Sequence, residues 1–381
     1  MFSGDVPLIA IVRGHVVNSF DTFINKRMMP PVMHLDMIMT TKCNLYCTYC
    51  FMEKKQPRSM SPDVLERAVA FHSEYCRHLN PQVTYIGGEP LIEIGLIEHA
   101  TALYRGICSK QGKTPGFSLT TNGTLLDQTM AERLAGMQIK YLLSIDGSEH
   151  SHNKYRHFAD GAPTWKLITS RLPELKRYQP WQGARVTVNP DTVCDLAEGV
   201  KCLFECGVNQ FIIGAATGVE WKDEEITAYE EQMLKVAQYH NEMKAKKAPI
   251  RLTIFEYDTE KPQDRKRGQW GCGAGRGRLS VDPAGTITGC AKIQGCNNGN
   301  GIFVLGNIFE GITNLRERYA LNWDNLQLRS KCRDCDIADR CSSGCPAVNF
   351  TETGNPFIPS DHNSKFTRIY HRLEEVLNAC A

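Results

Sequence analysis

Short apolar runs alternate with amphipathic stretches from Met33 to Lys247. The runs predict strands at His34–Met39, Val83–Ile86, Phe117–Thr120, Tyr141–Ile145, Ala184–Val188 and Gln210–Ile213. The intervening stretches predict helices from Pro62 through Phe71 and at Ile94–Ile107, Gln128–Leu134, Trp165–Tyr178, Leu196–Glu205 and Tyr229–Lys247. Ser61 and Pro62 are typical of the N-cap and the first position of a helix. This alternation predicts an α/β fold with a parallel sheet and helices packed outside it.

Six strands are too few for a complete eight-stranded barrel, so we expect a partial (β/α)6 barrel with an open side. In parallel α/β folds the chemistry lies at the carboxyl ends of the strands. A cysteine-rich loop follows the first predicted strand, the segment Gly87-Gly88-Glu89-Pro90 ends the second, and Thr121-Asn122-Gly123 ends the third. The candidate site is therefore expected at this end, with room for a large substrate.

The two flanks of the predicted barrel show weaker patterns. Residues 1–32 form an N-terminal segment, within which Leu8–Val17 suggests a short strand pair. The barrel would occupy residues 33–258, followed by a charged linker over residues 259–269. Residues 270–381 form a glycine- and cysteine-rich region that ends in a predicted helix at Phe366–Leu377. This region has few periodic apolar residues, and metal ligation could supply the missing stability.

Composition and charge exclude several classes of protein. The 381 residues have a formal net charge of +2, so a nucleic-acid partner is not expected. No apolar run is long enough for a membrane span, and the first residues do not resemble a secretion signal. We therefore expect a cytoplasmic protein without a membrane partner.

Cysteine usage is the unusual feature of the composition. The chain has 16 cysteines, and in a reducing compartment clustered cysteines are more often metal ligands than disulfides. Three lie within eight residues, and seven lie between Cys272 and Cys345. The remaining six are expected to be small buried hydrophobes: Cys76, Cys108, Cys194, Cys202, Cys206 and Cys380.

The first cluster consists of Cys43, Cys47 and Cys50. Four thiolates normally saturate a [4Fe–4S] cluster, so three would leave one iron open for a ligand. A structural zinc site is the competing interpretation, but it would need a fourth cysteine or histidine nearby. The glycines of Gly87-Gly88-Glu89-Pro90 would allow a ligand to approach the backbone closely, and Glu89 offers an anion for an amino group.

The cysteine triplet with Tyr49 before its third member, followed by Gly87-Gly88-Glu89-Pro90, resembles the radical S-adenosylmethionine (SAM) superfamily. The resemblance implies a [4Fe–4S] cluster on the three cysteines and a bound SAM, whose reductive cleavage gives a 5′-deoxyadenosyl radical. It further implies that Glu89 faces the methionine amine, and that Tyr49 and the Gly87–Pro90 segment contact the cofactor. Ser144 and Arg156 resemble residues near the ribose and the carboxylate.

The second cysteine region resembles the SPASM extension of the same superfamily, which binds up to two auxiliary [4Fe–4S] clusters. The matching spacings are Cys272-x12-Gly285-x4-Cys290 and Cys332-x2-Cys335-x5-Cys341-x3-Cys345. The resemblance implies one cluster on Cys272, Cys290 and Cys345 and another on Cys332, Cys335 and Cys341. Cys296 is a candidate fourth ligand of the first. The usual last cysteine is missing, and Asp361 stands in its place, with His362 as the second candidate. An unsaturated cluster open to substrate is the alternative.

Family members with this extension mostly modify peptides or proteins. We expect thioether crosslinking of a ribosomally made precursor peptide, with carbon–carbon (cyclophane) crosslinking as the alternative. An anaerobic sulfatase-maturase-like oxidase is less favoured, because Ala291 occupies the position of that branch's catalytic aspartate. A non-enzymatic iron–sulfur electron carrier or a zinc protein would not explain Gly87-Gly88-Glu89-Pro90.

The expected partners are the peptide and an external electron donor such as flavodoxin or ferredoxin. Only 42 residues precede Cys43, too few for a winged-helix domain that binds a peptide leader, so the leader is expected to dock elsewhere or to be recognised by a separate partner. No catalytic base is identified: Tyr85, Glu256 and Asp282 are interpreted as structural.

Overall fold

A single sheet with a linear strand order forms the centre of the molecule. The computed structural model describes residues 10–12, 15–17, 30–52, 57–254, 257–258, 270–294, 303–322, 332, 334–338, 341 and 344–378. Within these residues twelve strands follow the order β10-β9-β8-β7-β6-β5-β4-β3-β11-β12-β13-β14. The predicted six-strand core consists of β3 (His34–Thr40), β4 (Gln82–Gly87), β5 (Gly116–Thr121), β6 (Ile139–Ser144), β7 (Gly183–Val188) and β8 (Gln210–Ala215). All neighbours among these six are parallel, which confirms the predicted parallel α/β fold.

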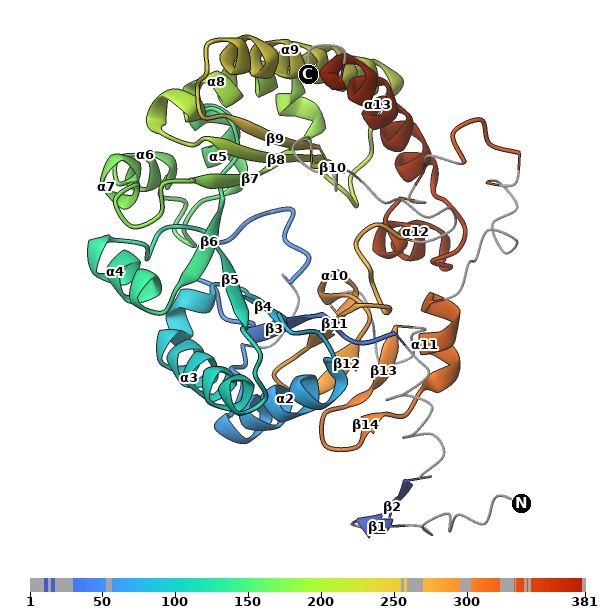
Figure 1. Cartoon of the computed structure of the whole chain (residues 1–381). Helices are drawn as coiled ribbons and strands as arrows, with labels where there is room; N and C mark the ends of the chain where they lie inside the picture. The colour runs from blue at the N-terminus through green and yellow to red at the C-terminus, as the bar shows by residue number, and fades with distance from the viewer. Residues whose placement is uncertain are drawn as a thin grey trace.

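Helices cover the outer side of this curved sheet (Figure 1). They include α2 (Pro62–Tyr75), α3 (Ile94–Lys110), α4 (Gln128–Gly136), α8 (Leu196–Cys206) and α9 (Asp223–Ala245). Ser61 caps α2 by accepting a hydrogen bond from the backbone N–H of Val64, as predicted. Helix α9 begins six residues before the predicted Tyr229, since three acidic residues, Asp223 to Glu225, stabilise its first turn.

Several local elements differ from the prediction. The single helix predicted over Trp165–Tyr178 is wrong: the structure has α6 (Trp165–Thr169) and α7 (Leu172–Leu175). Pro173, which lacks a backbone N–H, stands in the first turn of α7 and prevents one continuous helix. The structure also contains α5 (Glu149–Tyr155), η2 (Pro90–Glu93) and η3 (Pro190–Asp195), which the apolar pattern did not indicate because they are short.

The sheet extends beyond the six predicted strands at both edges. On one side β9 (Arg251–Ile254) is parallel to β8, and β10 (Tyr257–Asp258) follows antiparallel. On the other side β11 (Arg278–Val281) is parallel to β3 and leads to antiparallel β12 (Thr286–Thr288), β13 (Val304–Asn307) and β14 (Gly311–Ile312). The cysteine-rich region therefore shares the sheet of the barrel, and the division of the chain at residues 259–269 stays a prediction.

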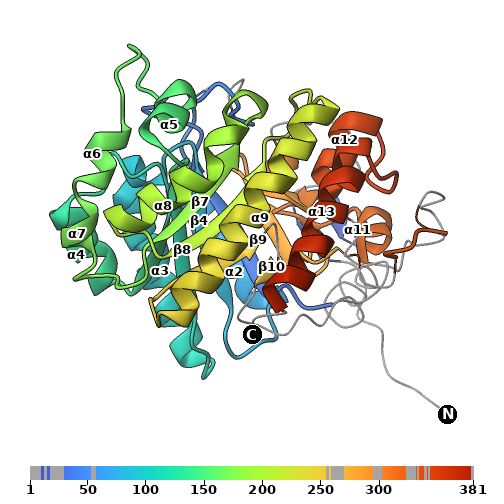
Figure 2. The same ribbon diagram turned by 90° about the horizontal axis from the view of Figure 1, so that it is seen from above.

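The C-terminal region adds helices α10 (Ala291–Gln294), α11 (Leu315–Asn322), α12 (Pro346–Thr353) and α13 (Asp361–Asn378). Helix α13 contains the predicted helix and lies beside α9 (Figure 2). Two ion pairs join these helices, Arg372 with Glu230 and Lys365 with Asp223, and the rings of Tyr229 and Phe366 pack 5.0 Å apart. The predicted N-terminal strand pair is present as antiparallel β1 (Ala10–Val12) and β2 (His15–Val17).

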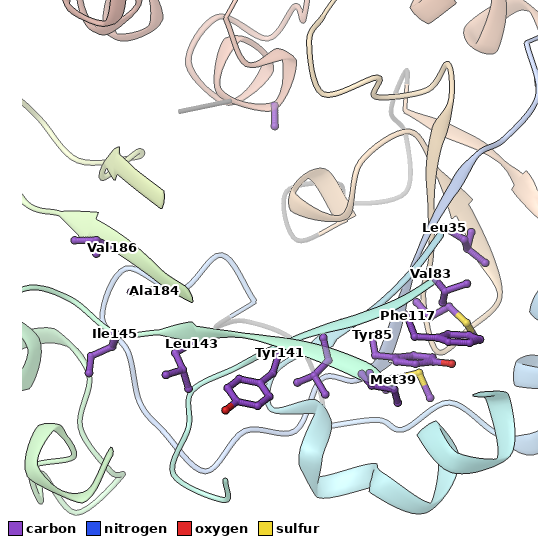
Figure 3. Close-up of a cluster of buried hydrophobic side chains, with 14 of the residues drawn as sticks. Leu35, Met39, Val83, Tyr85, Phe117, Tyr141, Leu143, Ile145, Ala184 and Val186 are labelled. Atoms are coloured by element: carbon purple, nitrogen blue, oxygen red, sulfur yellow. The ribbon is translucent and has the colours of Figure 1, made fainter. Parts of the chain in front are cut away.

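The two faces of the central sheet differ in polarity. Alternate strand residues such as Leu35, Tyr85, Phe117 and Leu143 pack toward the outer helices and form the main core (Figure 3). The residues between them face the interior of the curved sheet and include many polar side chains: His34, Asp36, Thr84, Ser118, Ser144, Arg185 and Arg278. A polar interior lined by strands is suited to bind a ligand rather than to serve as the core. In the described part of the chain, no helix is both long and apolar enough to cross a membrane.

Candidate functional site

The loop after β3 places Cys43, Cys47 and Cys50 at the carboxyl end of the sheet. The segment 155–158 that follows α5 holds this loop in place. The backbone N–H of Tyr46 donates to the carbonyl of His157 (2.9 Å), and that of Thr48 donates to the carbonyl of Tyr155 (3.3 Å). These hydrogen bonds hold the loop through its backbone groups, which leaves the three thiols available as ligands.

The three thiols lie close enough to affect one another electrostatically. Burial raises the pKa of Cys47 to about 12; Arg156 lowers it, and Cys50 and Cys43 raise it again. Among the described residues, no three cysteine, histidine or acidic side chains converge on a point where one metal ion could bind. A cubane takes each thiolate on a different iron, so it needs three thiols grouped around a cavity rather than on one ion. Three such thiols are the donor set that a [4Fe–4S] cluster with one open iron requires.

Gly87 and Gly88 allow the end of β4 to touch the backbone that leads into the cysteine loop. A Cβ at Gly88 would lie 2.1 Å from the carbonyl oxygen of Lys42, and one at Gly87 would lie 2.2 Å from that of Thr40. The backbone N–H groups of Gly88 and Glu89 donate to the carbonyls of Thr40 and Lys42, at 2.9 and 2.8 Å. The two glycines therefore leave space for the protein's own backbone just before Cys43.

Glu89 is fully buried beneath this contact. Its carboxylate accepts hydrogen bonds from the backbone N–H groups of Leu91 (3.0 Å) and Asn122 (2.7 Å) and from the hydroxyl of Thr121 (2.9 Å). Burial raises the pKa of Glu89 to about 7, although these three hydrogen bonds lower it. The carboxylate is therefore held in place by hydrogen bonds, and a cationic ligand beside it would favour its charged form.

Asn122 connects the carboxylate of Glu89 to the first cysteine. Its side-chain amide donates to Asn44 Oδ1 (2.9 Å) and lies 3.8 Å from Cys43 Sγ. Sequence reasoning placed Asn122 at a strand end but did not assign it to the site. Its place in the site was indicated in the sequence by its position at the end of a predicted strand, since the two preceding strands also end in recognisable motifs.

Asp146 joins Tyr49 and Arg156 in a buried cluster after β6. Arg156 binds both carboxylate oxygens of Asp146, through Nε at 2.7 Å and Nη2 at 3.2 Å. Tyr49 donates its hydroxyl hydrogen to Asp146, and the Arg156 guanidinium lies 5.1 Å from the Tyr49 ring centre. The backbone N–H of Thr187 on β7 also donates to Asp146 (2.7 Å). The sequence resemblance named Tyr49 and Arg156 but not Asp146, which orients both.

Ser144 is the last residue of β6 and pairs in register with Arg185 of β7. It lies two residues before Asp146 at the carboxyl end of the sheet, which is the end predicted for the site. Its proposed contact with a ribose stays a prediction, as does the contact of Arg156 with a carboxylate.

Cys272, Cys290 and Cys345 gather around β11, although they are far apart in the sequence. Cys272 and Cys290 both act electrostatically on Arg278, and Cys345 acts on Cys290. Burial raises the pKa of Cys290 to about 12. Arg278 makes two hydrogen bonds to Asp36 of β3, at 2.7 and 2.8 Å, and so ties these cysteines to the barrel. Cys296, the predicted fourth ligand, lies outside the described residues.

The remaining predicted ligands lie near α13. Arg368 acts electrostatically on Cys335 and Cys341, and its guanidinium is 3.6 Å from Cys335 Sγ. Cys332 precedes them, with its carbonyl accepting from the backbone N–H of Cys335 at 3.4 Å. Asp361 begins α13 and is exposed, two helical turns before Arg368. Its role as a ligand stays a prediction.

A comparison with known protein families matches the part of the chain that contains Cys43, Cys47, Cys50 and Glu89. Residues 37–198 match the family model described as the Radical SAM superfamily, so this range is a radical SAM domain. A cysteine-type anaerobic sulfatase-maturating enzyme of Clostridium perfringens is 30% identical over 158 residues, which cover 40% of this chain. The match spans only 42% of that enzyme's own length.

Two solved structures share the fold. "Native anSMEcpe with bound AdoMet and Cp18Cys peptide" has a TM-score of 0.71 at 19% identity, over 91% of this chain and 99% of that one. Streptococcus suis SuiB bound to precursor peptide SuiA has a TM-score of 0.56 at 16% identity, over 95% and 84%. At these identities the likeness establishes the architecture, which extends across both cysteine regions. The Radical SAM family uses a [4Fe–4S] cluster and SAM, and the thiols and Glu89 fit these groups by donor type.

Proposed function

We propose that this chain is a radical SAM enzyme that modifies a peptide and installs thioether crosslinks in it. The proposal depends mainly on one observation: three cysteines, the buried Glu89 and the Asp146 cluster meet at the carboxyl ends of β3 to β6. When bound, a [4Fe–4S] cluster and SAM would supply a 5′-deoxyadenosyl radical that abstracts a hydrogen atom from the substrate.

The chain's own residues would hold and shield these groups. Cys43, Cys47 and Cys50 would each bind one iron, and the Glu89 carboxylate would accept hydrogen bonds from the methionine amine. Asn122 would fix the position of Cys43, and Asp146 would fix that of Tyr49. Glu89, Asn122, Asp146 and Tyr49 are held by hydrogen bonds in advance of ligand binding, which reduces the ordering cost when a ligand binds.

An apolar cluster inside the sheet supports crosslinking over sulfatase-type oxidation. Ile38 and Met52 pack with Ala291, the residue after Cys290, and Cys50 and Ile86 border them. In the sulfatase-maturase branch the sequence resemblance places an aspartate base at this position, whereas Ala291 packs with Ile38 and Met52. A dry, apolar wall beside the radical site would protect a reactive intermediate from water.

A peptide substrate is supported by the structural neighbours. The anSMEcpe structure contains a bound Cp18Cys peptide, and the SuiB structure contains the precursor peptide SuiA. We propose a precursor peptide for this chain too, with a one-electron donor such as flavodoxin or ferredoxin as the second partner. Two auxiliary clusters are proposed, on Cys272, Cys290, Cys345 and Cys296, and on Cys332, Cys335, Cys341 and Asp361.

The experiment starts with anaerobic iron–sulfur reconstitution of the full chain. A protein with three cubanes would contain about twelve irons per chain. With SAM and a reductant the wild type should release 5′-deoxyadenosine, whereas Cys43→Ala should not. Cys194 was expected to be buried, but it is exposed. It is distant in sequence from both cysteine regions, so Cys194→Ala serves as the matched control. A reduced, iron-loaded wild type that releases no 5′-deoxyadenosine would refute the proposed enzyme.

The bond type is tested by mass spectrometry of a small peptide encoded beside the gene, after co-expression. Each thioether should lower the peptide mass by two hydrogens and make one cysteine unreactive to iodoacetamide. A loss of two hydrogens with the cysteine still reactive would indicate a carbon–carbon crosslink if the peptide does not react with an aldehyde probe, and oxidation of a serine to formylglycine if it does. A gain of oxygen or an unchanged mass would refute crosslinking altogether.

A further inference from the structure

Arg185 is a basic residue on the inner face of the sheet, in the middle of β7. Its neighbours Ala184 and Val186 are buried among the outward-facing core residues (Figure 3), so by strand alternation Arg185 points to the interior. It is partly buried and pairs in register with Ser144 of β6 and Ile212 of β8. The guanidinium therefore lies on the wall of the same polar interior at whose end the candidate site is found.

Two other arginines near the candidate site are neutralised by aspartates. Arg156 binds Asp146 and Arg278 binds Asp36, each through two hydrogen bonds. Arg185 differs, because within the described ranges no carboxylate forms an ion pair or hydrogen bond with it. Its positive charge is thus not balanced by an acidic side chain of the described structure.

Gly214, Tyr229 and Tyr370 are three neighbours of Arg185, and none of them carries a charge that balances it. The Nη2 of Arg185 lies beside Gly214 of β8, at 3.4 Å from where a Cβ would be, so the glycine leaves space for the guanidinium. Tyr229 of α9 and Tyr370 of α13 interact with it electrostatically, and burial raises the pKa of both phenols, so they carry no charge at neutral pH. A partly desolvated guanidinium with five donors and no counter-ion among the described residues is ready to bind an anion.

We propose that Arg185 binds a carboxylate of the peptide substrate, so that the peptide has an acidic side chain close to the position that is modified. This inference rests on the proposed function and names its substrate class. Arg185 would be a specificity-determining residue, because a planar guanidinium makes two parallel hydrogen bonds to a carboxylate and cannot make them to an amide.

The methionine carboxylate of SAM is the alternative carboxylate that Arg185 would bind. The methionine amine is expected at Glu89, after β4, which is three strands from β7, and the methionine carboxylate is expected at Arg156, after β6. Ser144, the neighbour of Arg185 in the sheet, is on the β6 side of β7. The Arg185 guanidinium also extends toward Gly214 on β8, which is away from β4. The position therefore favours the peptide.

The test measures the binding of defined peptides to the reconstituted, SAM-loaded full chain by equilibrium dialysis. The probes are radiolabelled acetyl-Gly-Asp-Gly-amide and acetyl-Gly-Glu-Gly-amide, each compared with its Asn or Gln counterpart. A charge-assisted pair should make the better acidic peptide bind about 10- to 100-fold more tightly than its amide. Arg185→Gln should abolish this preference and Arg185→Lys should retain part of it. Lys235→Gln, which removes an exposed charge from α9, should retain all of it.

Equal binding of acidic and amide peptides by the wild type would overturn the proposal, as would a preference that persists in Arg185→Gln. If Arg185→Gln instead loses SAM affinity tenfold while the peptide preference persists, the carboxylate belongs to SAM and the assignment to the peptide is wrong. Thermal melting checks that the variants fold, and Arg185→Lys provides the comparison if Arg185→Gln does not. Failure of the proposed function is recognised separately, because the wild type would then release no 5′-deoxyadenosine.

Discussion

Asp146→Asn tests whether the buried carboxylate holds the cysteine side of the site together. The substitution keeps the size of the side chain and removes its charge, which leaves Arg156 buried without a counter-ion. Both residues are almost completely buried, at 2% and 7% exposure. Removing one partner of a buried ion pair costs about 3–5 kcal/mol. For 381 residues the entropy of unfolding is about 0.8 kcal/mol per kelvin, so the midpoint of melting should fall by about 4–6 °C.

The assay is thermal and urea unfolding of the metal-free chain, with an exposed ion pair as the matched control. Glu98→Gln breaks the pair with Arg133, which is equally short at 2.8 Å but about 40% exposed on both sides, and should cost below about 1 kcal/mol. A double-mutant cycle of Asp146→Asn with Arg156→Met should give a coupling energy of about 2 kcal/mol or more. If Asp146→Asn costs no more than Glu98→Gln, or if the coupling is near zero, Asp146 does not organise this cluster.

Three further predictions concern the glycine contact, a buried histidine and the Glu89 carboxylate. Gly88→Ala should lower iron content after reconstitution, because its Cβ would overlap the Lys42 carbonyl, whereas Gly95→Ala, in open space on α3, should not. Burial lowers the pKa of His72 to about 3, so between pH 3 and 6.5 the unfolded chain binds more protons than the folded chain. The urea concentration at the unfolding midpoint should therefore fall as the pH drops through this range. In His72→Gln it should fall less steeply. With a pKa of about 7 in the free site, Glu89 should make SAM bind more tightly at pH 8 than at pH 6 by calorimetry. Glu89→Gln should bind SAM about tenfold more weakly and with a smaller difference between the two pH values, because only the α-amino group of SAM then titrates.

The order of strands and helices in the barrel was predictable because it depends on local periodicity. Each strand alternates or forms a short apolar run, and each helix repeats its apolar residues every three to four positions, so a short window contains the whole signal. Ser61 and Pro62 fix the start of α2 for the same reason, since a cap acts within one turn. The cysteine triplet and Gly87-Gly88-Glu89-Pro90 were recognisable because their spacing in the sequence is short and regular.

The strands β11 to β14 were missed because each has only two to four residues. Such segments have no period of their own and are stabilised by pairing with β3 and with one another. The helix break at Pro173 is an intermediate case: the proline was visible in the sequence, but amphipathic residues on both sides suggested one helix.

By itself, the sequence determined the parallel α/β order and the residue types that can bind iron and an amino group. Only the tertiary structure decided which charges meet. Asp146 pairs with Arg156 and Asp36 with Arg278, which leaves Arg185 unpaired in the described interior. Periodicity is a property of neighbouring residues along the chain, whereas an ion pair depends on which strands lie side by side and on their register. The partners Asp36 and Arg278 are 242 residues apart, and no local pattern in the sequence relates them.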